Sequence, residues 1–483
     1  MEKLVIVSNR VLLPRERSAR AGGLAVGVGY ILRRHGGLWF GWSGDIAEET
    51  STTPRITRAG ETTFAAVDLG RLDYQEYYSG FANGTLWPLF HYRLGMLEYS
   101  RQEFDGYRRV NAIFARALAS LVGSADLIWV HDYHLIPFGA ELRQLGLKNR
   151  IGFFFHTPFP AASVLELLPQ HEVLIDALGS YDLVGFQTEQ DLQAFQDYIV
   201  TKAGGSILPG GVIAARGRTF RAGVFAIGID TQKFARMAEA AAYSPETVRL
   251  KQSLTGRRLI IGVDRLDVSK GLPNRFEAYE RLLRNWPEHR ARVTLLQVAP
   301  RSRTEVASYR ELGRQLEQAA GRINGTYAEF DWAPIRYLNR TLSQKTLAGF
   351  YRLSRVGLVT PLRDGMNLVA KEYVAAQDAA DPGVLVLSRF AGAARELDGA
   401  LIVNPFDIDQ LAEAIHQALL MPLEERQTRW ASMMSVLRRN TVSTWCDGFI
   451  RSLRNMSPQE LQTKSPDMNR QQSRRSIVLP AVM

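Results

Sequence analysis

Short, continuous runs of apolar residues recur along this chain and alternate with longer segments in which apolar positions follow a helical period. The runs are rich in Val, Ile, Leu and Phe, and most of them lack strict alternation of apolar and polar residues. A strand covered on both faces shows this pattern, and strands that alternate with helices form parallel sheets. The pattern therefore predicts a parallel α/β protein.

Nine buried strands are predicted from these runs. They span residues 4–7, 127–130, 151–155, 183–186, 259–263, 293–298, 356–360, 384–387 and 400–403. Helical patterns cover residues 106–121, 273–285, 411–420 and 430–453. Because open α/β sheets bind ligands beyond the carboxyl ends of their strands, we expect functional residues at those ends.

The strand pattern also predicts the domain organisation. It is irregular in the first half of the chain and becomes a regular βαβ pattern in the second half. We predict two doubly wound Rossmann-like domains that face each other across a central cleft, covering residues 1–228 and 229–440. A helix at residues 441–455 is expected to pack back on the N-terminal domain. Residues 456–483 are rich in Ser, Gln and Arg and are predicted to be disordered.

Composition narrows the class of protein. Of the 483 residues, 46% are hydrophobic and 22% are charged, which is ordinary for a soluble enzyme. The net charge of +10 favours anionic substrates over nucleic acid, because the basic residues are scattered and no basic-aromatic module occurs. The single cysteine, Cys446, excludes an internal disulfide and fits a reducing compartment. No apolar run reaches the roughly 18 residues of a membrane helix, so we expect a cytoplasmic protein.

Two basic residues, Arg265 and Lys270, lie in the segment GVDRLDVSKG directly after the predicted strand 259–263. Two fixed cations can neutralise a diphosphate leaving group while its bond to a sugar breaks. The glycines of this segment permit close approach of the backbone. A pair of surface cations at a strand end is the alternative interpretation.

The segment PLRDGMNLVAKEY, residues 361–373, contains two carboxylates beside a glycine turn and a predicted helix start. Asp364 and Glu372 are eight residues apart, which indicates a similar face of a helix. Carboxylates accept hydrogen bonds from sugar hydroxyls, and the N–H groups of a helix start favour an anion. The alternative is an N-cap aspartate followed by a solvated helical glutamate.

The N-terminal half carries weaker signals. The paired glycines of AGGLAVG precede a helical pattern and can bring backbone amides to phosphate or sugar oxygens. Tyr78 and Trp87 flank a glycine-containing segment that we interpret as a loop lining a polar pocket. A loop pinned by core aromatics explains the same residues equally well.

Histidines gather at two predicted strand ends, in WVHDYH and HTPFP. His131, His134 and His156 can supply three metal ligands. Their spacing follows a strand and not a helix, so we favour hydroxyl binding by Asp132 and sugar contact by His156 over a metal site. Structural hydrogen bonding at strand ends is the remaining alternative.

The series of motifs resembles glycosyltransferase family 20, the family of trehalose-6-phosphate synthases. The similarity runs from near the N-terminus to about residue 453 and rests on many segments in the family's order. These segments are SNR, AGGLAVG, GGLWFGWSG, LWPLFHYR, WVHDYHL, FFFHTPFP, DLVGFQT, GVDRLDVSKGLP and PLRDGMNLVAKEYVAAQ.

The resemblance implies the GT-B fold and a retaining hexosyltransferase. Glucose would move from UDP-glucose to glucose 6-phosphate, giving α,α-trehalose 6-phosphate and UDP, with no cofactor and no metal. A glucosylglycerol-phosphate synthase using ADP-glucose and glycerol 3-phosphate is one alternative, and a non-catalytic sugar-phosphate sensor is another. The resemblance also implies a homo-oligomer, either a dimer or a tetramer. The preference among UDP, ADP and GDP is left open.

Carried over by motif, the resemblance implies roles for individual residues. The expected catalytic residues are Arg265, Lys270, His156 and Asp132. The expected donor-binding residues are Gly23, Arg265, Lys270, Asp364, Gly365, Met366, Asn367, Leu368, Val369 and Glu372. The expected acceptor-binding residues are Arg10, Tyr78, Trp87, Asp132 and Arg303.

Overall fold

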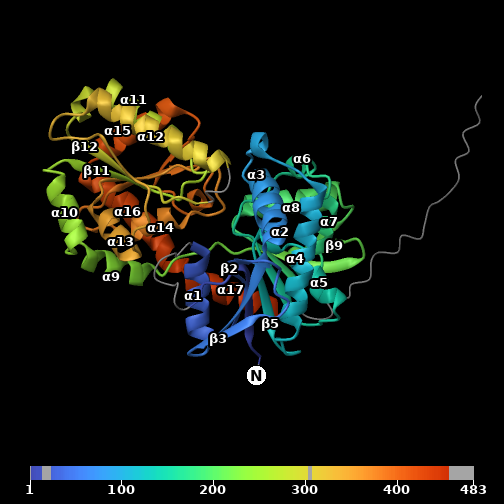
Figure 1. The fold of residues 1–483 in the computed structure, drawn as a ribbon. Helices are drawn as coiled ribbons and strands as arrows, with labels where there is room; N and C mark the ends of the chain where they lie inside the picture. The colour runs from blue at the N-terminus through green and yellow to red at the C-terminus, as the bar shows by residue number, and fades with distance from the viewer. Residues whose placement is uncertain (1, 14–22, 303–306, 456–483) are drawn as a thin grey trace, which may run out of the picture.

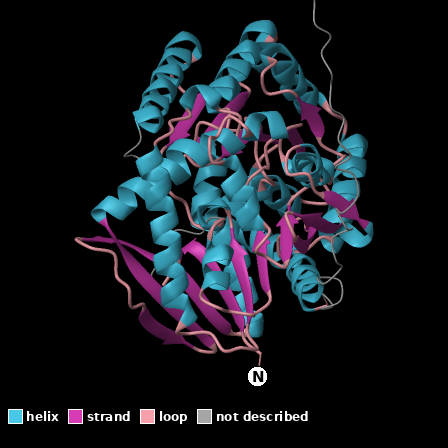
Figure 2. Cartoon of the chain, turned by 90° about the vertical axis from the view of Figure 1, so that its right-hand side faces the viewer, coloured by secondary structure: helices cyan, strands magenta, loops and turns pink. Residues whose placement is uncertain are grey.

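The structure is a computed structural model that describes residues 2–13, 23–302 and 307–455. It has two lobes, each built on one sheet with helices on its faces (Figures 1 and 2). The predicted pair of doubly wound α/β domains is confirmed. The predicted disordered tail, residues 456–483, lies outside the described residues, and so does Arg303.

The N-terminal lobe contains a ten-stranded sheet with the order β3-β4-β2-β1-β5-β6-β7-β10-β9-β8. Its strands are β1 (Leu4–Arg10), β2 (Gly37–Ala47), β3 (Arg55–Ala59), β4 (Thr62–Gly70), β5 (Leu127–His131), β6 (Ile151–Phe154), β7 (Leu183–Phe186), β8 (Ser206–Leu208), β9 (Val212–Ala215) and β10 (Arg218–Val224). The strands from β4 to β10 in this order pair in parallel, and the outer strands β3, β9 and β8 pair antiparallel.

Helices cover this sheet. They are α1 (Gly23–His35), α2 (Arg71–Asp73), η1 (Tyr74–Leu86), α3 (Trp87–Phe90), η2 (Leu94–Met96), α4 (Arg101–Ala119), η3 (Tyr133–Leu135), α5 (Phe138–Gln144), α6 (Ala162–Leu165), α7 (His171–Leu178), α8 (Glu189–Thr201) and η4 (Pro209–Gly211). The segment interpreted as a loop between Tyr78 and Trp87 is therefore helical, a π-helix that continues into α3. The glycines of this segment suggested a loop. The segment is helical because packing against α4 and the sheet buries aromatic side chains on it.

The C-terminal lobe contains a six-stranded, all-parallel sheet with the order β13-β12-β11-β14-β15-β16. In chain order this is third, second, first, fourth, fifth and sixth, the doubly wound arrangement. The strands are β11 (Arg258–Val263), β12 (Val293–Val298), β13 (Ile335–Leu338), β14 (Val356–Val359), β15 (Val384–Ser388) and β16 (Leu401–Val403). The order reverses between β11 and β14, and that point is where such sheets bind ligands.

The helices of the second half of the chain are α9 (Thr231–Ala241), α10 (Pro245–Ser253), α11 (Leu272–Asn285), η5 (Pro287–His289), α12 (Ala307–Tyr327), α13 (Gln344–Leu353), α14 (Leu368–Ala376), η6 (Gly392–Arg395), α15 (Ile408–Leu420), α16 (Leu423–Arg439) and α17 (Val442–Arg454). No helix in the described part of the chain is long and apolar enough to span a membrane.

The helical stretch predicted at residues 430–453 is wrong as one element, because it consists of α16 and α17. The helical conformation is interrupted at Asn440 and Thr441. There the Thr441 side chain accepts a hydrogen bond from the backbone N–H of Thr444 and starts α17 with a capping box. At this break Thr441 pairs with Ile229, and Val442 N donates to Ile229 O over 3.1 Å. The two passages of the chain between the lobes therefore run side by side.

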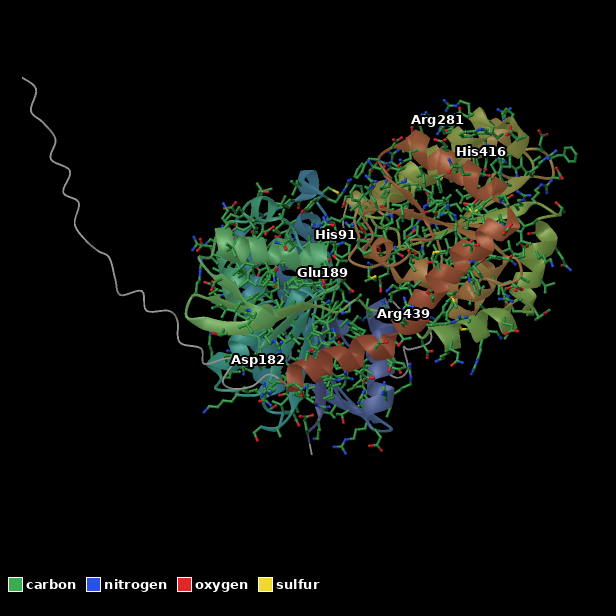
Figure 3. The ribbon with its side chains drawn as sticks, turned by 180° about the vertical axis from the view of Figure 1, so that it is seen from behind. His91, Asp182, Glu189, Arg281, His416 and Arg439 are labelled. Carbon is green, nitrogen blue, oxygen red and sulfur yellow. The ribbon has the colours of Figure 1, made fainter. Side chains whose placement is uncertain are left out.

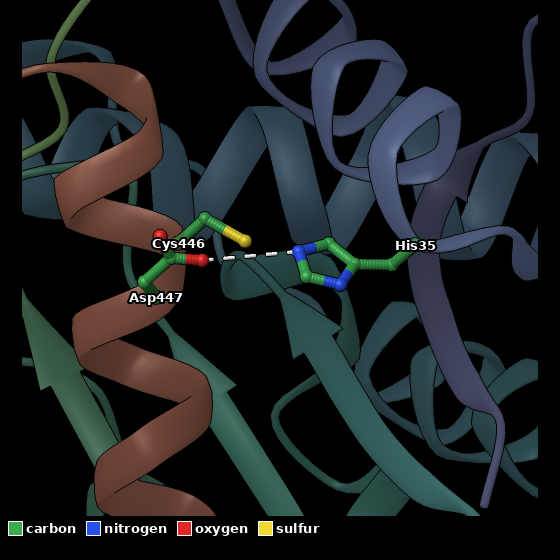
Figure 4. A group of neighbouring side chains, drawn as sticks. All are labelled: His35, Cys446 and Asp447. Carbon is green, nitrogen blue, oxygen red and sulfur yellow. Dashed lines mark ion pairs between the residues drawn. The ribbon is translucent and has the colours of Figure 1, made fainter.

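Helix α17 packs on the N-terminal sheet although it ends the described chain. The ring of Phe449 stacks on Trp129 of β5, with centroids 4.3 Å apart. A Cβ atom on Gly152 of β6 would lie 2.6 Å from the Phe449 ring, so this strand needs glycine there. On α1, Arg34 pairs with Asp447 at 2.9 Å. His35 pairs with the same carboxylate at 3.8 Å (Figure 4). Figure 3 shows α17 lying across the N-terminal lobe beyond Arg439, the last residue of α16.

Candidate active site

The two predicted donor cations lie in the loop between β11 and α11, at the carboxyl end of the first strand of the C-terminal sheet. Lys270 Nζ contacts Asp364 Oδ2 at 2.5 Å, and its side chain is only 11% exposed. Arg265 is 52% exposed, and its Nη2 is 3.8 Å from Asp267 Oδ2. Lys270 is thus held in place by Asp364 of the segment PLRDGMNLVAKEY. Arg265, at the same strand end, is exposed to solvent.

Two glycines, Gly262 in β11 and Gly271 at the end of the loop, make room for other protein groups. A Cβ atom on Gly262 would lie 2.4 Å from Arg275 Nη1, and one on Gly271 would lie 2.5 Å from Thr360 O. Gly271 also has a φ of 65°, which favours glycine. Arg275, which the sequence analysis did not select, is fully buried and donates to Asp264 Oδ2 at 2.8 Å. Arg275 also donates to Gln297 and Thr360, so it ties together the ends of β11, β12 and β14.

The second donor motif forms a turn that leads into α14. Asp364 Oδ2 accepts from Lys270 Nζ and also from Asn367 Nδ2 at 3.0 Å. Asn367 has a φ of 77°, and its Oδ1 caps α14 by accepting from Ala370 N. Met366 is buried in the turn, and Leu368 and Val369 form the first turn of α14. Asp364 therefore connects the Lys270 ammonium to the turn that starts α14.

Asp364 and Glu372 are not related by helical spacing. The helix begins at Leu368, so Asp364 and the three residues after it are outside the helix, and the expectation of a shared helical face is wrong. Glu372 is half-buried on α14, and its Oε1 accepts from Gln344 Nε2 at 3.3 Å. Burial raises the pKa of Glu372 to about 7, with the Gln344 bond acting in the opposite direction.

Asp132 and His156 meet where β5 and β6 end. Asp132 Oδ1 accepts from the backbone N–H groups of His156 and Thr157 at 3.1 and 3.4 Å. Burial raises the pKa of Asp132 to about 6, although these bonds favour its charged form. Asp132 adopts a φ of 76° and a ψ of 165°, a region that is essentially restricted to glycine. Strain of this kind is typical of functional positions.

His156 and His131 contact each other directly. Nε2 of His156 lies 3.1 Å from Nδ1 of His131. Burial lowers the pKa of His156 to about 3 and that of His131 well below its usual value, so both rings are neutral. A neutral imidazole can accept a hydrogen bond from a sugar hydroxyl or donate one to it, depending on its tautomer.

Two of the predicted acceptor residues, Arg10 and Tyr78, lie near the carboxyl end of β1. The Arg10 guanidinium lies 5.9 Å from the ring of Trp42, and Trp42 contacts Tyr78 with centroids 5.3 Å apart. Tyr78 in turn stacks on His134. Trp42 was missed, although its motif GGLWFGWSG was noted, because one aromatic in an apolar strand gives no separate signal. Arg10, Trp42 and Tyr78 form one cationic and aromatic cluster.

Trp87 is buried and stacks on His91, with centroids 3.7 Å apart. His91, also missed, binds Trp87 O through Nδ1 at 2.9 Å. Burial lowers the pKa of His91 to about 4, and the charges of Asp267, Asp364 and Lys270 act on it. His91 belongs to the N-terminal lobe and these charged residues to the C-terminal lobe, so Trp87 and His91 lie where the lobes meet (Figure 3). Gly23 is the first residue of α1.

Two groups of three potential metal ligands occur in the described residues: His35, Cys446 and Asp447, and Glu288, His289 and His416. Figure 4 shows the first group. Its Asp447 already pairs with Arg34, and burial raises the pKa of the Cys446 thiol to about 12. In the second, His289 Nε2 contacts His416 Nδ1 at 2.9 Å. Neither group contains the three histidines considered from the sequence.

Comparison with known proteins covers nearly the whole chain. A family model described as glycosyltransferase family 20 matches residues 3–455. A trehalose-6-phosphate synthase of Sinorhizobium fredii (strain NBRC 101917 / NGR234) is 54% identical over 456 residues, which are 94% of this chain and 98% of that protein. A trehalose-6-phosphate synthase of Enterobacter sp. (strain 638) is 49% identical over 463 residues, 96% of this chain and 97% of that one.

Solved structures are equally similar. An α,α-trehalose-phosphate synthase (UDP-forming) from Burkholderia xenovorans, in complex with glucose-6-phosphate, matches with a TM-score of 0.91 and 53% identity. That match covers 94% of this chain and 100% of the other. An E. coli structure bound with UDP-2-fluoro glucose matches with a TM-score of 0.90 and 48% identity, covering 94% of this chain and 99% of the other.

Proposed function

This chain belongs to glycosyltransferase family 20 and has the GT-B fold, and from that premise we propose that it is a UDP-forming trehalose-6-phosphate synthase. It transfers glucose from UDP-glucose to glucose 6-phosphate and releases α,α-trehalose 6-phosphate and UDP. The observation that carries the proposal is the contact between Lys270 and Asp364. It joins the proposed diphosphate-binding cation to the proposed sugar-binding carboxylate where the neighbouring strands β11 and β14 end. The likeness to structures that hold glucose-6-phosphate and a UDP-sugar analogue supports both substrates.

We assign the donor to the C-terminal lobe, residues 229–440. An ammonium has three donors, so Lys270 can hold Asp364 and still donate to the diphosphate. Arg265 supplies the second positive charge from the same loop. Glu372 accepts from the ribose hydroxyls, and Asp364 with the turn from Gly365 to Val369 holds the transferred glucose. Gly23 is proposed to approach the diphosphate.

We assign the acceptor to the N-terminal lobe, residues 1–228. Arg10, Tyr78 and Trp87, together with Arg303, surround the phosphate and ring of glucose 6-phosphate. Asp132 accepts a hydrogen bond from a hydroxyl group of the acceptor sugar. Its bonds to the backbone N–H groups of His156 and Thr157 hold His156 in place. The neutral His156 contacts the transferred glucose.

The reaction follows from charge and orientation. As the glucosyl–oxygen bond breaks, negative charge grows on the departing diphosphate, and Arg265 and Lys270 stabilise it. The acceptor oxygen attacks the anomeric carbon on the same face, which retains the configuration. Its proton passes to the departing phosphate oxygen, so both bonds and the proton are accounted for without an enzyme nucleophile. Binding both sugars between the lobes contributes orientation.

We also propose the cofactor requirement, the cellular location, the oligomeric state and the boundary between the lobes. The enzyme uses no cofactor and no metal, since the donor is itself a substrate. It works in the cytoplasm, which suits a chain whose single cysteine is buried and free. It forms a homo-oligomer, either a dimer or a tetramer. The lobes are separated near residue 228, and α17 completes the N-terminal lobe.

A donor-by-acceptor panel tests this function. UDP-, ADP- and GDP-glucose are each combined with glucose 6-phosphate, glycerol 3-phosphate or glucose, and release of nucleoside diphosphate is measured. We expect the highest rate with UDP-glucose and glucose 6-phosphate, and an α,α-linked product by NMR. The Lys270→Ala variant is the control for contaminating activity. Turnover only with ADP-glucose and glycerol 3-phosphate would identify the glucosylglycerol-phosphate synthase, and binding of sugar phosphate without release of nucleotide would identify a sensor.

A further inference from the structure

Arg363, which no motif argument selected, reaches from the C-terminal lobe to two separate loops of the N-terminal lobe. Its Nε donates to Phe90 O at 3.2 Å, and its Nη2 donates to Phe159 O at 3.1 Å. Phe90 ends α3, and Phe159 belongs to the HTPFP segment after β6. A planar guanidinium can donate in two directions at once, and one side chain therefore spans both loops.

The ring of Tyr92 supports the same guanidinium. The Arg363 Cζ atom lies 3.9 Å from the centroid of this ring, a cation–π geometry. Tyr92 has a φ of 56°, which is rare for a residue with a side chain. Its hydroxyl accepts from Ala161 N at 2.9 Å, so the ring is fixed between the loops at residues 90–92 and 159–161.

A buried carboxylate lies behind this contact. Asp191, in the first turn of α8, accepts from Phe159 N through Oδ1 at 2.9 Å and so orients the peptide next to the Phe159 carbonyl. Burial raises the pKa of Asp191, and the positive charge of Arg363 acts in the opposite direction. Hydrogen bonds, a ring face and a negative charge thus converge on Arg363 from the opposite lobe.

The neighbours of Arg363 in sequence belong to the donor site. Asp364 contacts Lys270, and Gly365 packs against the carbonyl of His156. On the other side, His91 stands between Phe90 and Tyr92, is 2% exposed, and lies within the electrostatic reach of Lys270 and Asp364. Arg363, which contacts the opposite lobe, and Asp364, which is predicted to bind the donor, are therefore adjacent in the sequence.

We propose that Arg363 is a positioning residue that latches the two lobes together and, through the peptide it shares with Asp364, couples their closure to the donor site. This inference rests on the proposed function. Arg363 itself touches neither substrate. It holds the acceptor lobe in the one orientation in which His156 and Asp132 face the glucose bound near Asp364, because its bonds to Phe90 and Phe159 exist only when the lobes are in contact.

The test compares Arg363→Ala and Arg363→Lys with Arg395→Ala. Arg395 is a matched control, since it also bonds across the lobes, through Nη2 to Gln190 Oε1 at 2.8 Å, but is not a neighbour of the donor turn in the sequence. We expect Arg363→Ala to lower kcat about 10- to 100-fold, as a misplacement of about 1 Å does, with UDP affinity by calorimetry unchanged within about threefold. Arg363→Lys should resemble Arg363→Ala because an ammonium lacks the fork. Arg395→Ala should stay within about twofold of wild type.

Hydrogen exchange supplies a readout that does not require turnover. With UDP-glucose bound, peptides covering residues 87–93 and 157–163 should exchange faster in Arg363→Ala than in the wild type, and Tyr92→Leu should show the same change to a smaller extent. Wild-type exchange and kcat in Arg363→Ala would overturn the inference. Equal losses of kcat, UDP affinity and melting temperature would also overturn it, because they indicate a merely structural role. If the wild type itself releases no UDP, the proposed function fails, and the exchange comparison still decides whether Arg363 latches the lobes.

Discussion

A Cβ atom on Gly365 would lie 2.1 Å from the carbonyl oxygen of His156, although the two residues belong to different lobes. Only glycine permits this approach, since real Cβ atoms do not come so close to an oxygen. The donor turn and the turn that carries a predicted sugar-binding histidine therefore meet backbone to backbone.

Gly365→Ala should separate these two turns. We expect kcat to fall at least about tenfold, because reacting groups displaced by about 1 Å lose orientation. Donor affinity should change less, since Arg265, Lys270 and Glu372 all lie in one lobe. The matched control is Gly448→Ala in α17, where an added Cβ meets no atom within 4 Å. That control should be fully active and up to about 1 kcal/mol more stable, and normal kinetics in Gly365→Ala would show that the contact can relax.

Lys270→Ala and Arg265→Ala should each lower kcat about 10²- to 10³-fold, the scale for losing a principal electrostatic donor. The two variants should differ in stability. Lys270 is largely buried against Asp364, so its loss leaves a buried carboxylate with less compensation and lowers the melting temperature. Arg265 is about half exposed and should not affect melting. Lys251→Ala, on an exposed position of α10, is the control. Wild-type turnover in either site variant would remove that residue from the mechanism.

The raised pKa of Glu372 predicts that stability and donor affinity depend on pH. Its pKa is raised to about 7 by burial, so the unliganded protein holds a proton that the unfolded chain releases above its ordinary pKa. The stability contribution of this group therefore falls as pH rises toward about 7. Binding of ribose hydroxyls favours the ionised form, so affinity for UDP-glucose should rise through the same range. In Glu372→Gln both trends should flatten, as measured by thermal melting and calorimetry between about pH 5 and 8. Parallel profiles in the two proteins would assign the titration to another group.

Asp132 couples backbone strain to a predicted role in binding the acceptor. Both Asp132→Ala and Asp132→Gly lose the bonds to the N–H groups of His156 and Thr157, but only glycine relieves the strained backbone. Asp132→Gly should therefore be about 1–2 kcal/mol more stable than Asp132→Ala in denaturant unfolding. Both should lose activity to a similar extent. Equal stability of the two variants would mean that the backbone relaxes to an ordinary conformation.

Much of the fold could be predicted from local patterns because buried parallel strands are continuous apolar runs. All nine predicted strands are present. Seven strands were not predicted, namely β2, β3, β4, β8, β9, β10 and β13. An edge strand such as β3, or a strand of four residues with only one buried position such as β13, has no such run. The helix η1 was missed because its glycines suggest a loop, and only packing against α4 reveals otherwise.

Local patterns were sufficient to predict the fold class, the family and most of the residues proposed for chemistry, because parallel strands and turn motifs are local in the chain. Which groups meet could be read only from the three-dimensional arrangement. Lys270 and Asp364 are 94 residues apart, and Arg363 and Phe90 are 273 apart, yet both pairs are in hydrogen-bond contact. Whether such groups touch depends on how two sheets are oriented, and that orientation is set by many weak contacts spread over the whole chain, none of which leaves a local pattern.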